Sequence, residues 1–267
     1  MNLVDFKKYI PEQGIPLVIA EDGKENCGYN TRSRHLILYH LPSDRYLSIQ
    51  PIGKRSELIR IPSENIRVWV VDLQHYLFSV LKGSFDISYY LHPKNKNVQW
   101  FLDQYPIDQH QSLKDQFYTF IAQANTLNPL NYAKDLFMSL AKTFDRNERE
   151  ITFLLHTFRT YLVAEKILRN DRFPNPNLYA LKQDHKHDAI ITAILTADSG
   201  NTLLQPYEII QCKETFEKWD YELKHIASIR NIHDFTYNEV LNYGNHLFLN
   251  LLNPINPNEL KTNGKSC

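Results

Sequence analysis

The spacing of apolar and polar positions along the chain changes near residue 72. Before that point, short apolar runs alternate with turn segments such as "DGKENCGYN" and "LPSD", which is typical of short strands. The run Val68–Val71 is continuously apolar, as expected for a strand that is buried on both faces. Strands are therefore predicted over residues 15–21, 35–41, 45–50, 57–61 and 66–72.

After residue 72 the apolar positions recur at helical spacing. The apolar residues between Leu73 and Leu81 fall on one face of a helix, Asp72 stands at its start as a capping residue, and Gly83 follows as a stop. The same reasoning predicts helices over residues 72–83, 85–91, 112–125, 128–144, 147–170, 187–198, 206–230 and 236–252.

This order of elements predicts an α+β fold, with a small mixed sheet first and a helical half after it. The predicted units are an α/β domain over residues 1–95, a helical domain over 96–252 and a disordered tail over 253–267. Five clustered aromatic residues are interpreted as core rather than as platforms for stacking bases: Tyr89, Tyr90, Phe117, Tyr118 and Phe120.

Charge and cysteine content narrow the range of functions. The 267 residues contain 30 Lys and Arg against 30 Asp and Glu, so no overall basic field predicts binding to nucleic acid or to an anionic membrane. The three cysteines form no C-x-x-C pair, which argues against a zinc ribbon or a dithiol site. No apolar run is long enough to span a bilayer, and we expect a cytoplasmic protein without a membrane partner.

The segment "DHKHD", Asp184–Asp188, has a composition that could bind a metal ion. His185 and His187 would share a face on a strand but would point apart on a helix. Because a helix is predicted directly after them, we favour an exposed loop in which Asp184 or Asp188 caps that helix. A metal site is the alternative.

Six segments, in this order and spacing, resemble the nucleotidyltransferases of the DNA polymerase β superfamily that are found with bacterial RNA-repair genes, the YcgL-like group. They are "LVIAEDGKENCGY" (Leu17–Tyr29), "TRSRHLILYH" (Thr31–His40), "DRYLSI" (Asp44–Ile49), "VVDLQHYLFSVLKGSFDISYYLHP" (Val70–Pro93), "TFLLHTFRTYLVAEKIL" (Thr152–Leu168) and "FPNPNLYAL" (Phe173–Leu181). The resemblance implies a nucleotidyltransferase-like first domain followed by a helical domain.

The resemblance also implies where metal ligands should stand. In such enzymes two acids lie two residues apart on one strand, and a third comes from a neighbouring strand, so that Mg²⁺ ions can bridge the nucleotide phosphates. In this chain the two acids are replaced by Arg34 and Leu36, and the third by Arg67. An arginine in place of a carboxylate inverts the charge that the metal needs. The chain is thus expected to have lost metal-dependent transfer and to need no cofactor.

Binding is the function that this pattern favours, with a nucleotide, an RNA or a protein as partner. The expected phosphate-binding residues are Gly23, Lys24, Ser33, Arg34, Arg67 and Arg159. Two alternatives stay open. One is an active nucleotidyltransferase that uses Mg²⁺ with relocated carboxylates, for which the candidates are Asp22, Glu25 and Asp72. The other is an interaction scaffold outside this family, in which the helical half docks a protein partner.

Overall fold

The computed structural model describes residues 15–30, 34–41, 56–61, 66–83, 85–127, 129–130, 133, 138, 151–170, 172–200, 202–229 and 236–252. Four of the predicted features therefore fall wholly or largely outside the described residues: the strand over 45–50, most of the helix over 128–144, the tail over 253–267 and Ser33.

Five strands form one mixed sheet in the order β3-β4-β2-β1-β5. Strands β2 and β4 are parallel, and the other neighbours are antiparallel. The predicted α+β class with a small mixed sheet is confirmed. The bounds are β1 Ile15–Glu21, β2 Arg34–Leu41, β3 Ser56–Ile61, β4 Ile66–Asp72 and β5 Val98–Trp100.

The edge strand β5 was not predicted from the sequence. It has only three residues, and it pairs with β1 from Val18 to Ala20. Its segment follows the polar stretch "KNKN" and is too short to show an alternating pattern. Pairing with β1, rather than any local preference, makes this segment a strand.

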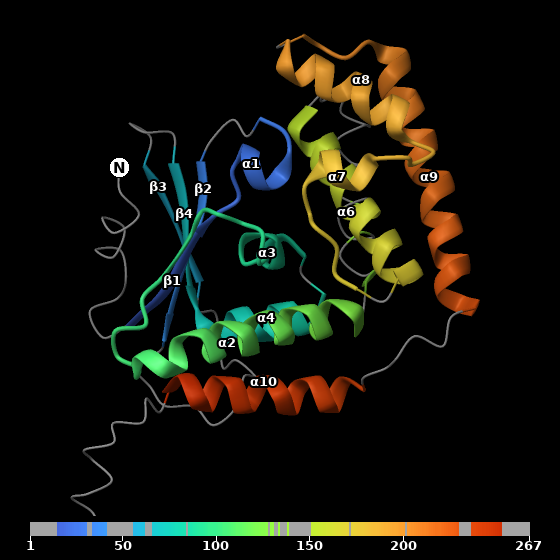
Figure 1. Cartoon of the computed structure of the whole chain (residues 1–267). Helices are drawn as coiled ribbons and strands as arrows, with labels where there is room; N and C mark the ends of the chain where they lie inside the picture. Colours follow the sequence, from blue (N-terminus) through green and yellow to red (C-terminus); the bar gives the residue numbers. More distant parts are fainter. Residues whose placement is uncertain are drawn as a thin grey trace, which may run out of the picture.

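One face of the sheet packs against three helices to form the first core. These are α2 (Leu73–Leu81), α4 (His110–Leu127), which follows a short 3-10 helix over Ile107–Gln109, and α10 (Tyr237–Leu252). Figure 1 shows them layered beneath the strands, with α10 outermost. Helices α4 and α10 both lie C-terminal to residue 95, yet they share this core with the sheet.

The second core forms around α6 (Ile151–Asn170), which is buried along most of its length. Three further helices pack around it: α7 (Leu178–Lys182), α8 (Asp188–Ser199) and α9 (Pro206–Ile229). Aromatic side chains join α6 to α9, since the ring centroids of Phe158 and Phe216 lie 4.4 Å apart.

Two short helices, α1 (Lys24–Cys27) and α3 (Phe85–Tyr90), lie between the sheet and α6–α9 (Figure 1). In α3 the adjacent residues Tyr89 and Tyr90 belong to different cores, Tyr90 to the first and Tyr89 to the second. Both are buried, as are Phe117 and Phe120 of α4, so the interpretation as core is confirmed for these four residues, whereas Tyr118 is only half-buried, with its ring edge-on to Trp100.

Among the described residues, no helix has the length and apolar character that crossing a membrane requires.

The predicted cap at the start of α2 is present: Asp72 Oδ1 accepts a hydrogen bond of 2.7 Å from the backbone N–H of Gln74. We expect Asp72→Ala to lower the free energy of unfolding by about 1 kcal/mol, because the N–H loses its acceptor. Asp72→Asn should retain most of the stability, since Asn caps helices about as well. Urea denaturation of both variants tests this. Equal losses in the two variants would show that the carboxylate charge, and not capping, is what matters.

Candidate functional site

The candidate site begins at the turn that follows β1. Gly23 is the residue before α1, and its carbonyl oxygen accepts the backbone N–H groups of Asn26 and Cys27. A Cβ atom added at Gly23 would meet its neighbours at 3.6 Å or more, which is ordinary contact. Lys24 and Glu25 point outward and are exposed. The turn therefore has no steric need for glycine at this position.

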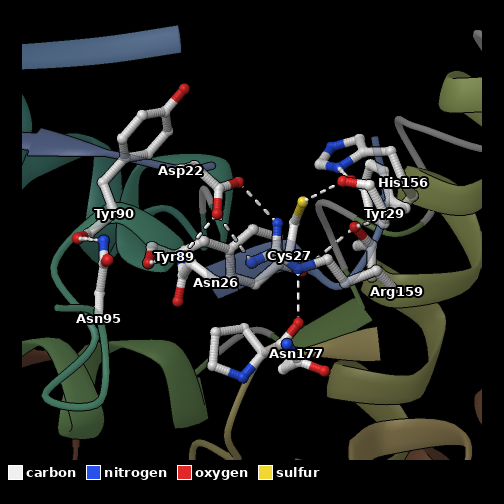
Figure 2. A network of polar contacts seen from close by, with 12 residues as sticks. Asp22, Asn26, Cys27, Tyr29, Tyr89, Tyr90, Asn95, His156, Arg159 and Asn177 are labelled. Carbon is white, nitrogen blue, oxygen red and sulfur yellow. Dashed lines mark hydrogen bonds and ion pairs between the residues drawn. The ribbon is translucent and has the colours of Figure 1, made fainter. Parts of the chain in front are cut away.

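The central contact of the site is an ion pair between Asp22 and Arg159. Arg159 Nη1 lies 2.7 Å from Asp22 Oδ2, and Nη2 lies 3.1 Å from Oδ1, so the two planar groups meet through two parallel hydrogen bonds (Figure 2). The side chain of Arg159 is 0% exposed and that of Asp22 is 13% exposed. This pair joins the end of the interior strand β1 to the middle of α6.

The remaining donors and the flat face of the guanidinium are also used. Arg159 Nε donates to the carbonyl oxygen of Pro176 at 2.6 Å, and its Cζ lies 4.0 Å from the centre of the Tyr89 ring. Burial by itself would lower the pKa of Arg159, but the charge and hydrogen bonds of Asp22 and the nearby Tyr29 and Tyr89 together outweigh it, so the pKa is raised and the charge is permanent. Arg159 is thus fully engaged within the protein.

Two asparagine side chains hold the turn in place. Asn26 Nδ2 donates to Asp22 Oδ1 at 2.6 Å and to the Tyr89 carbonyl oxygen at 2.9 Å. Asn95 Nδ2 donates to the carbonyl oxygens of Glu21 at 2.9 Å and Tyr90 at 2.7 Å. Both Asp22 oxygens are therefore occupied, and the backbone on either side of the turn is tied to α3 (Figure 2).

A cysteine, a tyrosine and a histidine line the same turn. Cys27 Sγ donates to the carbonyl oxygen of Tyr29 at 3.2 Å, and the Tyr29 hydroxyl lies 3.3 Å from His156 Nδ1. Burial raises the pKa of Cys27 to about 12 and places that of Tyr29 well above its usual range. Both groups stay protonated at neutral pH, so Cys27 has little of the thiolate character that nucleophilic attack needs.

Gly28 is the position where glycine is required. Its φ is +85°, and its backbone N–H closes α1 on the Lys24 carbonyl oxygen at 2.8 Å. A Cβ atom here would lie 3.0 Å from both Asn177 Oδ1 and the Leu178 nitrogen. Beside this contact, Asn177 Nδ2 donates to the Glu25 carbonyl oxygen at 3.0 Å. The turn and the start of α7 are therefore in close backbone contact.

The positions that the resemblance assigns to metal ligands do not converge on one face. Leu36 pairs with Val68 in the parallel ladder and is fully buried, whereas Arg67 pairs with His35 and is exposed. Because side chains alternate along a strand, Leu36 and Arg67 point to opposite faces of the sheet. Arg34 begins β2 in register with Ile66, at the same end of the sheet as Gly23 and Lys24.

Arg67 lies beside a second exposed arginine. It is the direct partner of Arg60 in the antiparallel β3–β4 ladder, and both side chains are exposed. Trp69, two residues further along β4, faces the same side and is 39% exposed. In the part of the chain that the structure describes, neither guanidinium has an ion-pair partner. We call Arg60, Arg67 and Trp69 the arginine surface.

The three carboxylates proposed for the active alternative are not brought together. Asp72 pairs with His40 of β2, and His40 in turn pairs with Pro16 at the start of β1. Asp22 and Glu25 follow the other end of β1. The seven residues of β1 span about 20 Å between these ends. Among the described residues, no group of three or more His, Cys, Asp or Glu side chains could hold a metal ion.

The "DHKHD" histidines take part in a second polar cluster, in the helical half. Glu165 Oε2, on α6, accepts from Trp219 Nε1 at 2.7 Å and lies 3.0 Å from His185 Nε2. Glu165 Oε1 accepts from Arg169 Nε at 2.8 Å. Burial opposes ionisation of Glu165, but these hydrogen bonds outweigh it and lower its pKa to about 2. The segment is a loop, as predicted, but His185 and His187 are half-buried in it, because their rings pack at a tilt against Trp219.

The capping prediction for α8 is wrong. The residue before the helix is His187, which makes no side-chain cap, and Asp188 is already the first helical residue. Asp188 instead forms an ion pair of 2.5 Å with Lys182 of α7 and accepts from Thr192. Asp184 has a φ of +57°, a conformation in which Asp is one of the better tolerated residues.

Several residues of the site carried no signal in the sequence. Asn26, Tyr29, Tyr89 and Asn177 lie in segments that carry the resemblance, but nothing in the sequence assigned them to the site, to which they contribute through backbone contacts and burial. The only local cue was the polar turn "PNPN" after α6, which supplies the Pro176 carbonyl oxygen.

In comparisons with known proteins, no protein-family model matches the chain, and no curated protein matches it significantly. Among solved structures, the chain is similar to a nucleotidyltransferase-like protein from Exiguobacterium sibiricum, at 12% sequence identity and a TM-score of 0.32. The match covers 97% of this chain and 90% of that chain. At this TM-score the likeness is too weak to support a conclusion about fold or function.

The Asp22–Arg159 pair should dominate the stability of the site. We expect Asp22→Ala to lower the free energy of unfolding by about 3–5 kcal/mol, because it leaves a fully buried guanidinium uncompensated. Arg159→Met should cost less, since Asp22 is partly exposed and can recruit water. The double variant should lose less than the sum of the two. Urea denaturation provides the measurement, with Arg169→Met as control, because Arg169 is 55% exposed and Glu165 retains Trp219 and His185 as partners when it is removed. Additive losses would contradict the predicted coupling.

The second polar cluster predicts a pH dependence of stability. Burial, with His185 and Lys186 nearby, lowers the pKa of His187 from 6.5 to about 4, against the opposing charges of Glu165 and Glu222. Between these two values the unfolded chain takes up a proton that the folded protein does not. The free energy of unfolding should therefore fall as the pH decreases from about 6.5 to about 4.

Denaturation at a series of pH values tests this dependence. The pKa of His92 is also lowered to about 4, so the wild-type slope contains both residues. His187→Gln should reduce the slope of the free energy of unfolding against pH, leaving the part that comes from His92. An unchanged slope in this variant would show that His187 is not responsible.

Proposed function

We propose that this chain is a nucleotidyltransferase-like protein that binds the phosphates of a nucleotide or of single-stranded RNA without metal-dependent transfer, and that the arginine surface is where it binds them. The observation that carries the proposal is the pairing of Arg60 with Arg67 directly across two strands. Like charges in this position repel each other and destabilise a sheet. A bound phosphate between the two guanidinium groups would convert this repulsion into attraction.

Trp69 gives the surface a means of contacting bases as well as phosphates. Arg67, Trp69 and Val71 project from the same face of β4. The first two side chains are exposed, and Val71 is buried in the first core. An indole beside a cationic groove is the combination that binds single-stranded nucleic acid, because each base can stack on the ring. A single aromatic side chain suits one base, so we expect modest affinity with little sequence preference.

Two features support binding over catalysis. The place that the resemblance gives to the second metal-binding acid holds the buried Leu36, on the opposite face of the sheet from Arg67. Asp22, the acid nearest the β1 turn, has both oxygens occupied by Arg159 and Asn26. Ligation of a metal by Asp22 would require this buried pair to open.

Binding of a labelled single-stranded oligoribonucleotide at low salt tests the proposal, with ATP as a separate ligand to distinguish RNA from free nucleotide. Arg67→Glu and Arg60→Glu should each weaken binding by about tenfold or more. Each should also reduce the slope of log affinity against log salt by about 0.7, the value for one phosphate contact on a single strand. Trp69→Ala should weaken binding with little change in this slope. Lys96→Glu, at an exposed lysine outside the surface, is the control for net charge.

Two outcomes would overturn this assignment. If both arginine variants bind as tightly as the wild type, the arginine surface is not the site. If the wild type transfers nucleotides to RNA with Mg²⁺, and Glu25→Gln abolishes this, the protein is an enzyme. Glu25 is suited to that test because it is exposed and its removal should not disturb folding.

A further inference from the structure

The arginine surface presents two positive charges at one place. Arg60 and Arg67 are direct partners in the antiparallel β3–β4 ladder, so both side chains project from the same face of the sheet. The Cβ atoms of such a pair lie about 4.5–5.5 Å apart. Both side chains are exposed, and within the described residues neither has an ion-pair partner. A ligand that contacts one of these guanidinium groups is therefore within reach of the other.

The charge of a phosphate determines how well it suits this pair of arginines. A phosphate inside an RNA chain is a diester with a single negative charge, so it would leave one of the two positive charges uncompensated. A phosphate at the end of a chain is a monoester, which carries about 1.5 to 2 negative charges at neutral pH because its second pKa is about 6. The monoester therefore matches the two arginines in charge, and the diester does not.

The free oxygens of the phosphate favour the same ligand. A guanidinium group binds phosphate best through two parallel N–H donors that contact two oxygens. A diester has two free oxygens and therefore one pair of this kind, which a single arginine occupies. A monoester has three free oxygens. Arg60 and Arg67 can then each bind a different pair of oxygens, with one oxygen shared between them.

The surface has room for one base beside this phosphate. Trp69 follows Arg67 by two residues on β4, so their Cα atoms lie about 7 Å apart and their side chains share a face. The indole is 39% exposed, which leaves part of the ring open for stacking on a base. Val71, the next residue on this face, and Ile37, which pairs with Trp69 on β2, are both buried. Neither provides a platform for a second base.

We propose that the arginine surface recognises a terminal phosphate monoester together with the nucleoside that bears it, in preference to the phosphates within a chain. This ligand occurs in two forms, as a free nucleoside monophosphate and as the phosphorylated end of an RNA chain. The inference rests on the function proposed above, because it concerns the same residues. It adds which kind of phosphate those residues select.

Oligoribonucleotides of one sequence that differ only at one end test this preference at low salt. The 5′ end carries a hydroxyl group, a phosphate or the methyl ester of that phosphate, and a second set carries the same three groups at the 3′ end. The methyl ester is close to the phosphate in size but has a single negative charge. At one of the two ends, the phosphate should bind at least about fivefold more tightly than its methyl ester, because a further unit charge about 4 Å from a guanidinium contributes that much even in water. Competition by AMP distinguishes the two forms of the ligand: equal affinity identifies the free nucleotide, and weaker affinity identifies the RNA end.

Two variants of the arginine pair show whether both charges are needed. Arg60→Gln and Arg67→Gln each leave one guanidinium, which a single negative charge neutralises, so the ratio between phosphate and methyl ester should fall toward one in both. Trp69→Ala should weaken binding of all strands alike and leave this ratio unchanged. Lys96→Glu, the control for net charge, should also leave it unchanged. Circular dichroism of each variant confirms that it is folded.

The outcomes separate this inference from the proposed function. If all strands bind equally well and Arg67→Gln weakens all of them, the surface binds phosphates in general, so the proposed function stands and this inference is overturned. A preference for the phosphate that persists in both glutamine variants also overturns it, because the terminal phosphate then contacts other residues. If no strand and no AMP binds, the inference and the proposed function are both overturned.

Discussion

The arrangement of the whole molecule depends on one buried ion pair, between Asp22 and Arg159. It connects the end of β1, at the sheet, with the middle of α6, in the second core. A guanidinium that is completely buried is tolerated only while its carboxylate partner and its backbone acceptor are both in place. The short helices α1 and α3 are therefore held between the two cores by electrostatic as well as apolar contacts. Close packing of Gly28 against the start of α7 adds a further contact between the β1 turn and the helical half.

Asp22 and Arg159 stabilise the fold, and their charges are therefore not open to a ligand. Residues that would serve phosphoryl transfer in an open cleft are here bonded to each other and to Asn26, Tyr89 and Pro176. The charge that is free to meet a ligand lies instead on β3 and β4, where two arginines face each other without a carboxylate among the described residues. The β1 turn stabilises the fold, and the arginines of β3 and β4 are the residues to which the proposed function assigns the phosphates.

The helical half likewise separates buried charge from exposed charge. Glu165 is buried and is satisfied by Trp219, Arg169 and His185, which locks α6, α9 and the segment before α8 together. The hydrogen bonds of Glu165 therefore fix α9 against α6. On the opposite side of α9, Tyr207, Ile210 and Tyr221 are exposed. Glu217 and Lys218 are exposed there too, and neither forms an ion pair within the described residues.

The sequence by itself determined the features that depend on neighbouring residues. Apolar periodicity located β1, β2, β3 and β4 and the helices α2, α3, α4, α6, α8, α9 and α10, but not the short helix α7. Asp72 could be recognised as a cap because its partner is only two residues away. Contacts between distant residues were decided by the tertiary structure. Asp22 and Arg159 were both singled out in the sequence, but for different roles, because nothing local shows that residues 137 positions apart meet. The face of Arg67, the short strand β5 and the contacts of His185 and His187 with Trp219 likewise depend on register and packing, which periodicity does not encode.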